Sequence, residues 1–325
     1  MCLPARTFYS DGFWWYLIGI AFAGICVFGI AEYFEDDDCY IFTKISAVIM
    51  AFLIICWCVL ALFSSTLFNA KRYSKLIEVE EGNFQEDFKA VSADALITLD
   101  MATAQQLGSR VIGNLENISR YSIDKEYNLV SINGEYHRVT PLEYDGAFKA
   151  LNNSAEGLPA YVTVDATENK AQMVELEDEM KYSSNAFGKY NLKRHLRGEY
   201  SDYIFGKEQF EIDDDGNPYY IVPVMETNIG MFGGKTVKSF IILDPVSGDT
   251  DECDLDELPN WVEHAYSLGN LMDLAECHYG LKQGFWASLV DGSGVYDISY
   301  EYADSEDHFD GYSSIVINGE IYFLT

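Results

Sequence analysis

The sequence lacks the motifs of the common enzyme classes. No pair of histidines has the His-Glu-x-x-His spacing of a metallopeptidase helix. No Gly-x-Ser-x-Gly elbow of an α/β-hydrolase occurs. The glycine turns at 231–234 and 291–294 lack the strand and helix of a nucleotide-binding loop, and Lys235 does not have a Walker spacing. We therefore assign no catalytic, cofactor-binding or metal-binding residue from the sequence.

Metal-ligating side chains are few and scattered. The five histidines are His137, His195, His264, His278 and His308. His264 and His278 are fourteen residues apart with no companion ligands beside them, so ordinary surface histidines are the expected interpretation. Residues 211–216 resemble the start of a calcium loop, but the twelfth position from Glu211 is Val222, where a bidentate glutamate is needed. Because Asn217-Pro218 follows, we expect a hairpin turn there instead.

Cysteine usage excludes a disulfide framework. Three of the seven cysteines lie in long apolar runs, where a thiol acts as a small apolar group: Cys26, Cys56 and Cys58. Later in the chain only Cys253 and Cys277 remain. Export would allow these two to pair, but two cysteines make neither a framework nor a zinc site.

Positive charge is scarce. The chain has 21 Lys and Arg against 52 Asp and Glu, a net charge of −31. Such a surface repels nucleic acid and anionic lipid, which leaves cations, basic peptides and basic protein faces as partners. One basic segment, 189–197, interrupts the acidic sequence. We expect it to be a helix face that pairs with neighbouring acids, with a phosphate or lipid site as the alternative.

Two long uncharged runs open the chain, Gly12–Ala31 and Ile45–Ala70. Each is long enough to cross a hydrocarbon core of roughly 30 Å as a helix. A secretory signal has a shorter apolar core, and a buried hairpin of a globular protein would show a polar face. The sequence therefore predicts a membrane hairpin in residues 1–70, with spans Gly12–Ala31 and Ile45–Phe68.

The basic residues that flank the two runs indicate which side of the membrane the termini face. Arg6 precedes the first run, and the second is followed by Lys71, Arg72 and Lys75, whereas the connecting loop has only Lys44. By the positive-inside rule this count predicts that both termini are cytoplasmic. The spans hold no charge, which indicates an anchor rather than a transport pathway.

A repeated pattern follows the hairpin. Asn133-Gly134 stands between two alternating runs, the strongest short signal for a β-hairpin. The pattern recurs around Gly216 and begins again at 315–325, and the strands 160–165 and 240–244 each end in an aspartate turn. A helix is expected before each hairpin, at Met101–Ile112, 190–200 and 260–279.

The fold class is thus α+β, a helical hairpin followed by small helix-plus-antiparallel-sheet units at 71–180, 181–259 and 260–325. The third unit stops at Thr325, before its aspartate-turn strand. Three alternatives follow: another chain completes this sheet, the chain is a shortened version of a longer protein, or the last hairpin pairs onto the sheet of the second unit.

The aspartate turns resemble those of the PepSY module of bacterial envelope proteins. Leu243-Asp244-Pro-Val-Ser-Gly248 follows that pattern, and Val164-Asp165-Ala-Thr-Glu-Asn169 has Asn in place of Gly. The segments 76–87, 138–144, 156–161, 232–234 and 258–262 are similar to a group of uncharacterised bacterial two-helix membrane proteins. The resemblance implies an envelope location, with regulation of a peptidase or peptide binding, and supplies no catalytic residue. It places the soluble part outside the cytoplasm, against the count of bases.

These observations favour a membrane-anchored, non-enzymatic binding or scaffold protein, with a protein partner or self-association through the unfinished sheet and no nucleic acid. The alternative is a subunit of a membrane enzyme or transport complex. A cleft in which carboxylates with perturbed pKa values converge would support an enzyme.

Overall fold

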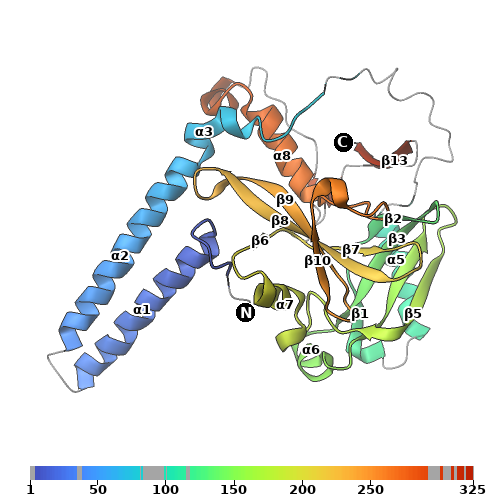
Figure 1. The fold of residues 1–325 in the computed structure, drawn as a ribbon, viewed down its shortest axis with the longest axis horizontal. Coiled ribbons are helices and arrows are strands. Elements are labelled where there is room, and N and C mark those ends of the chain that lie inside the picture. Colours follow the sequence, from blue (N-terminus) through green and yellow to red (C-terminus); the bar gives the residue numbers. More distant parts are fainter. Residues whose placement is uncertain are drawn as a thin grey trace.

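The computed structural model describes residues 4–34, 39–80, 82, 99, 101–114, 118–291, 301–302, 309–310, 313–317 and 320–324. Two apolar helices come first, and two five-stranded antiparallel sheets follow them (Figure 1). The architecture is a mixed α+β fold, as the sequence predicts.

The first two helices, α1 (Asp11–Phe34) and α2 (Cys39–Ser64), pack against each other as a hairpin that projects from the sheets (Figure 1). Both are long and apolar enough to cross a membrane. Their apolar side chains face outward, with Val27 63% and Phe52 64% exposed. Neither helix is therefore the buried core helix of a soluble domain.

The second apolar helix ends at Ser64, before the predicted boundary at Phe68. The Ser64 and Ser65 hydroxyls donate to the carbonyls of Leu60 and Leu62 at 2.8 and 2.6 Å. Ser65 is extended (φ −73°, ψ 160°) and precedes a separate short helix, α3 (Thr66–Tyr73). Serine hydroxyls that compete for helix carbonyls in this way bend or end a helix.

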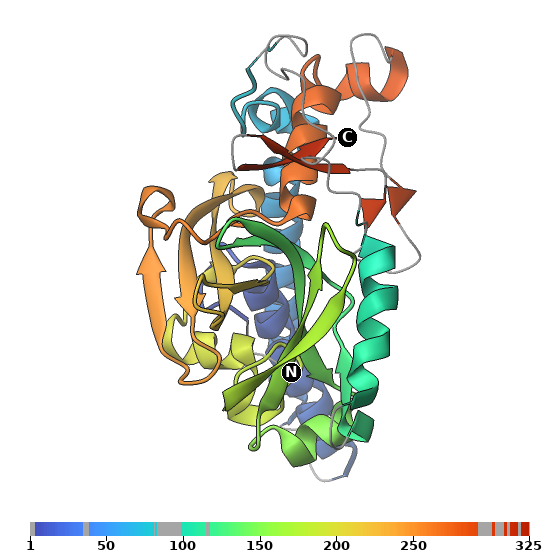
Figure 2. The ribbon, with the colours of Figure 1, turned by 90° about the vertical axis from the view of Figure 1, so that its right-hand side faces the viewer.

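The first sheet has the order β1-β3-β4-β5, with β2 beside β3. Helix α5 covers β4 and β5 (Figure 2), and α6 connects β3 to β4. Asn133 and Gly134 both have positive φ, 53° and 86°, so the predicted hairpin turn is confirmed. The elements are α5 (Met101–Val111), η2 (Ile112–Asn114), η3 (Ile118–Arg120), β1 (Tyr121–Ile123), β2 (Asn128–Ile132), β3 (Glu135–Tyr144), α6 (Ala147–Asn153), β4 (Leu158–Asp165) and β5 (Ala171–Met180).

The second sheet has the order β10-β9-β8-β6, with β7 beside β8. Its hairpin β7–β8 turns at Gly216 (φ 87°), where the Asp213 carboxylate accepts the backbone N–H of Asn217 at 2.7 Å. The predicted turn is confirmed here too. The elements are η4 (Gly188–Tyr190), α7 (Leu192–Glu199), β6 (Ile204–Phe205), β7 (Gln209–Ile212), β8 (Pro218–Ile229), β9 (Gly233–Leu243), β10 (Thr250–Cys253) and η5 (Leu255–Glu257).

The two aspartate turns have the same structure. The Asp165 carboxylate accepts the backbone N–H of Thr167 at 2.8 Å, and the Asp244 carboxylate accepts that of Val246 at 2.8 Å. The two sheets nevertheless share one hydrophobic core, which includes Val162 and Leu158 from β4 and Val222 from β8. The two sheets are therefore packed against each other through a common core.

The C-terminal part begins with α8 (Leu268–Leu281), which is shorter than the predicted helix 260–279. The Ser267 hydroxyl caps it by accepting the N–H of Asn270 at 3.3 Å, while Pro259 and Trp261 lie in an irregular segment. Strands β13 and β14 pair as the predicted third hairpin, although its turn and the glycine turn at 292–294 lie outside the described residues. In the described part, β13 and β14 pair only with each other. The remaining elements are η6 (Ala287–Asp291), β11 (Glu301–Tyr302), β12 (Phe309–Asp310), β13 (Ser313–Ile317) and β14 (Glu320–Leu324).

The sheets are held at the open end of the helical hairpin. The Ser64 hydroxyl accepts the backbone N–H groups of Met231 and Phe232, in the β8–β9 turn, at 3.0 and 3.3 Å. The Phe232 ring meets the Trp14 ring edge-on, with centroids 6.3 Å apart. A third contact joins the backbone N–H of Arg6 to the Ser201 carbonyl at 2.8 Å. Both ends of the hairpin are thus attached to the second sheet.

Candidate functional site

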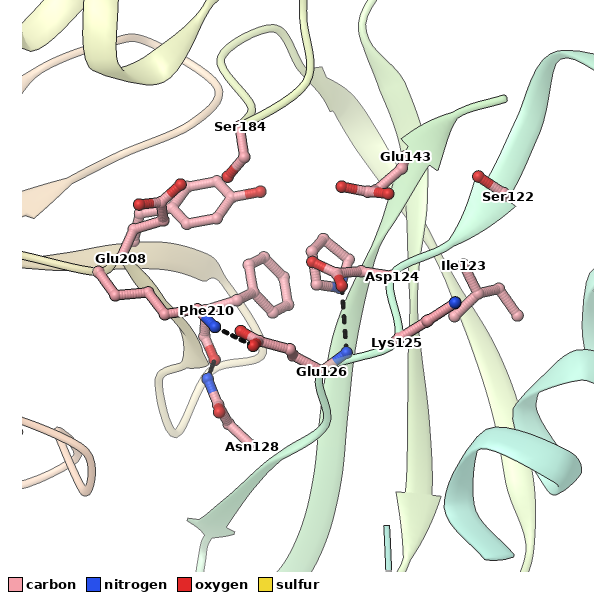
Figure 3. A pocket seen from close by; sticks show the side chains of 13 residues that line it. Ser122, Ile123, Asp124, Lys125, Glu126, Asn128, Glu143, Ser184, Glu208 and Phe210 are labelled. Carbon is pink, nitrogen blue, oxygen red and sulfur yellow. Dashed lines mark hydrogen bonds and ion pairs between the residues drawn. The ribbon is translucent and has the colours of Figure 1, made fainter. Parts of the chain in front are cut away.

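A cavity of about 410 Å³ lies where the two sheets meet (Figure 3). Its walls come from β1 and β3 on one side and from β7 and β8 on the other. The lining residues are Ser122, Ile123, Asp124, Lys125, Glu126, Asn128, Pro141, Glu143, Ser184, Lys207, Glu208, Phe210 and Tyr220.

Four carboxylates line this cavity. Asp124 and Glu126 stand in the connection from β1 to β2, Glu143 on β3, and Glu208 just before β7. Figure 3 shows Glu208 on the wall across from Glu143 and Asp124. Because the walls come from both sheets, the carboxylates meet only in the folded chain.

Two of the carboxylates have a cationic partner. Lys207 pairs with Glu126, and Lys193 on α7 lies 3.0 Å from Glu208. The Glu143 carboxylate has no hydrogen bond or ion pair within the described part of the chain. When it is ionised, Glu143 therefore has no counterion among the described residues of the cavity.

The electrostatics of the cavity favour the neutral form of that carboxyl. Burial, with the nearby charges of Asp124 and Glu126, raises the pKa of Glu143 to about 7. Burial also raises the pKa of Asp124, against the lowering effect of the backbone N–H of Glu126, which donates to it at 3.1 Å. Binding of a proton or another cation therefore stabilises the site.

Tyr220 supplies a hydrogen-bonding group to the same space. It is only 3% exposed, and its ring packs edge-on against Phe210 with centroids 5.4 Å apart. Burial and the charges of Asp124, Glu208 and Glu143 raise its pKa well above 10, so the phenol stays protonated. A protonated phenol at the cavity wall can donate a hydrogen bond to a ligand.

Glu211 is buried outside the cavity and has a structural role. Its two carboxyl oxygens accept the backbone N–H groups of Glu263 and His264 at 2.8 and 2.6 Å. Burial raises the pKa of Glu211 to about 8 and lowers the pKa of His264 to about 4. The calcium-loop alternative is thereby excluded, because this carboxylate holds the segment before α8.

The other histidines lie apart. His195 is 2.7 Å from the Gly248 carbonyl, His278 is 2.7 Å from the Ser74 carbonyl, and His137 lies on β3. His308 is outside the described residues. No three His, Cys, Asp or Glu side chains in the described ranges lie close enough to hold a metal ion. Cys253 and Cys277 are free thiols.

The basic segment 189–197 forms η4 and α7. Lys193 in this segment forms an ion pair with Glu208, as predicted for a basic helix face beside acidic residues. The Arg197 side chain donates instead to the backbone carbonyls of Tyr200, Ser201 and Tyr203, at 3.1, 3.3 and 2.6 Å. The end of α7 is thereby fixed.

Sequence reasoning missed the cavity. One signal was present, since Glu143 is an acid that stands on β3 between Leu142 and Tyr144, both of which are buried. The partner residues on β7 and β8 had no such signal, because their approach depends on how the sheets pack.

No protein-family model, curated protein or solved structure in the comparisons matches this chain.

Proposed function

We propose that the chain is a membrane-anchored, non-enzymatic binding protein, with the cavity between its sheets as the ligand site. Support for the anchor comes from α1 and α2, whose length, composition and outward-facing apolar side chains suit two membrane spans. The observation that carries the binding role is the Glu143 carboxylate, which has no hydrogen bond or ion pair among the described residues and lines a cavity that Tyr220 also lines.

The ligand is expected to be an organic cation, such as a lysine or arginine side chain of a peptide. The cavity is much larger than one metal ion, and the carboxylates are distributed around it. Phe210, Ile123 and Pro141 supply apolar walls for an aliphatic stem, and Glu143 and Asp124 supply acceptors for its charged end. A basic peptide also suits the net charge of −31.

The PepSY-like resemblance extends this proposal to regulation of an envelope peptidase or to another protein partner. The count of flanking bases places both termini in the cytoplasm, and the resemblance places the sheets outside it. Alternatively, the partner is a second copy of the chain, which would pair through β13 and β14.

The test measures binding of short peptides to the full chain in lipid nanodiscs by titration calorimetry. Three peptides differ only in one residue: arginine, lysine, or the neutral isostere citrulline. We expect Glu143→Gln to weaken the arginine peptide about tenfold, as the loss of a charged hydrogen bond does. The matched control is Glu175→Gln, an exposed acid on β5 away from the cavity. Equal binding of the arginine and citrulline peptides would overturn the proposal.

The second candidate is an acid–base enzyme, or a subunit of one. The observation that favours it is the raised pKa of Glu143 beside Asp124, because carboxyls in unlike environments serve as proton donor and acceptor. Mass spectrometry of the same peptides after incubation separates the two candidates. Cleavage that stops in Glu143→Gln while binding persists would identify an enzyme.

A further inference from the structure

One surface of the sheet domain carries large exposed apolar side chains. Phe148 and Leu151 are 83% and 50% exposed and stand three residues apart, on one face of α6. Phe187 is 53% exposed and lies at the end of the same helix, because its backbone N–H donates to the Ser154 hydroxyl at 2.7 Å. These three exposed apolar side chains, on α6 and at its end, are here named the α6 patch.

Basic side chains continue this surface along η4 and α7. Lys189 and Arg194 are exposed in a chain that is otherwise strongly acidic, whereas Lys193 between them pairs with Glu208. Exposed aromatic and aliphatic side chains beside lysine and arginine are the composition of protein surfaces that lie at the headgroup level of a bilayer.

The surface adjoins the point where α1 would enter the bilayer. Just after α7, the Ser201 carbonyl accepts the backbone N–H of Arg6, in the segment that leads into α1. Phe8 and Tyr9 of that segment are also exposed, at 57% and 51%. Figure 1 shows α6 and α7 on the side of the sheets toward which the hairpin extends.

We propose that the α6 patch and the basic face of α7 rest on an anionic leaflet, with the apolar side chains inserted at the headgroup boundary and Lys189 and Arg194 facing lipid phosphates. This inference rests on the proposed anchoring by α1 and α2. The net charge of −31 repels an anionic leaflet as a whole, so contact requires a local basic face at the side nearest the bilayer. The structure places the basic segment on that side, attached to the start of α1.

The experiment is photocrosslinking of the full chain in nanodiscs with p-benzoylphenylalanine in place of Phe148. The nanodiscs contain phosphatidylcholine alone or mixed with phosphatidylglycerol, and lipid adducts are measured by mass spectrometry. The same label at Phe52, on the outward face of α2, reports anchoring, and the label at Leu255 serves as an exposed control on η5.

We expect adducts at the Phe148 and Phe52 positions and none at the Leu255 position. The Phe148 adduct should be severalfold stronger in the mixed bilayer and should lose this gain in Lys189→Gln/Arg194→Gln. Adducts at the Phe52 position alone would overturn the surface contact and leave the anchor intact, whereas their absence at both would overturn the anchor. Equal Phe148 yields in both bilayers would overturn the role of the basic residues, and crosslinks to protein would overturn the lipid contact.

Discussion

The backbone N–H of Asn133 donates to the Asp214 carboxylate at 3.0 Å, and the Asn133 side-chain amide donates to the Asp214 carbonyl at 2.9 Å. The turns of the first and second hairpins therefore contact each other directly. Asn133 also has a positive φ of 53°, a conformation that asparagine and glycine tolerate best.

Substitution of this turn should destabilise the packing of the two sheets. Asn133→Ala loses the amide and strains the left-handed backbone, at a cost of about 1–3 kcal/mol. Asn133→Gly loses the amide without the strain, so its melting temperature should lie between those of Asn133→Ala and the parent chain. Asp215→Ala, an adjacent exposed acid, is the control, and equal melting of Asn133→Ala and Asn133→Gly would contradict the strain argument.

A second prediction concerns the attachment of the β8–β9 turn to the helical hairpin. A Cβ at Gly233 would overlap the Tyr73 hydroxyl and the Ser64 carbonyl. Gly233→Ala should therefore displace the turn, seen as faster hydrogen exchange at 229–234. Gly280→Ala on α8 meets no neighbouring atom within 4 Å and should leave that exchange unchanged. Protection that survives Gly233→Ala would show that the turn is held by other contacts.

A third prediction couples α5 to the first sheet. The Tyr127 hydroxyl is buried without a hydrogen-bond partner in the described part of the chain, and a Cβ at Gly108 would overlap it. Tyr127→Phe should stabilise the fold by ~1 kcal/mol, since it removes an unsatisfied polar group. Gly108→Ala should cost ~1–3 kcal/mol alone and much less with Tyr127→Phe. Additive changes in a double-mutant cycle of melting temperatures would refute this contact.

A fourth prediction follows from the pKa of Glu143, which rises from 4.5 to about 7 on folding. The folded state binds this proton more tightly than the unfolded state does. The associated stability is complete below about pH 4.5 and is lost as the pH rises through about 7. Glu143→Gln should flatten this part of the stability–pH curve, with Glu175→Gln as the unchanged control.

The same ionisation sets the pH dependence of ligand binding. A cationic peptide should bind more tightly as the pH rises from 6 to 8, on either side of the pKa of about 7, because Glu143 becomes charged. Affinity that is independent of pH in this range would place the peptide elsewhere.

A fifth prediction addresses the side of the membrane. Cys253 and Cys277 are free and partly exposed, and burial with neighbouring acids raises the pKa of both thiols. A membrane-impermeant maleimide should therefore label them slowly at pH 7 and faster at about pH 8.5, nearer their pKa. Labelling of intact cells places the sheets outside the cytoplasm. Labelling only after lysis places them inside.

Local signals predicted much of the fold. Asn133-Gly134 and the residues around Gly216 determine tight turns through their own backbone preferences, and Asp165 and Asp244 bind the N–H groups that follow them. These features depend on a few adjacent residues, and the structure confirms them.

The features that the sequence did not predict depend on packing between distant segments. The break at Ser65 lies inside an uncharged run, and the contact between Asn133 and Asp214 depends on how the sheets approach. The cavity likewise joins Glu143 to Tyr220, two residues from different sheets. The segment before α8 is predicted to be helical. The Glu211 carboxylate instead accepts the backbone N–H groups of Glu263 and His264 in this segment and holds it in an irregular conformation.

The β8–β9 hairpin links the helices mechanically to the cavity. Its turn is fixed at Ser64 and Trp14, and its hydrogen-bonded ladder continues, with one register shift, to the pair formed by Tyr220 and Leu243. A displacement at the turn is therefore transmitted through paired strands to a wall of the cavity, with no intervening loop to absorb it. In the proposed membrane-anchored form, the tilt of α1 and α2 and the occupancy of the cavity would be linked variables, each shifting the other by the same free energy.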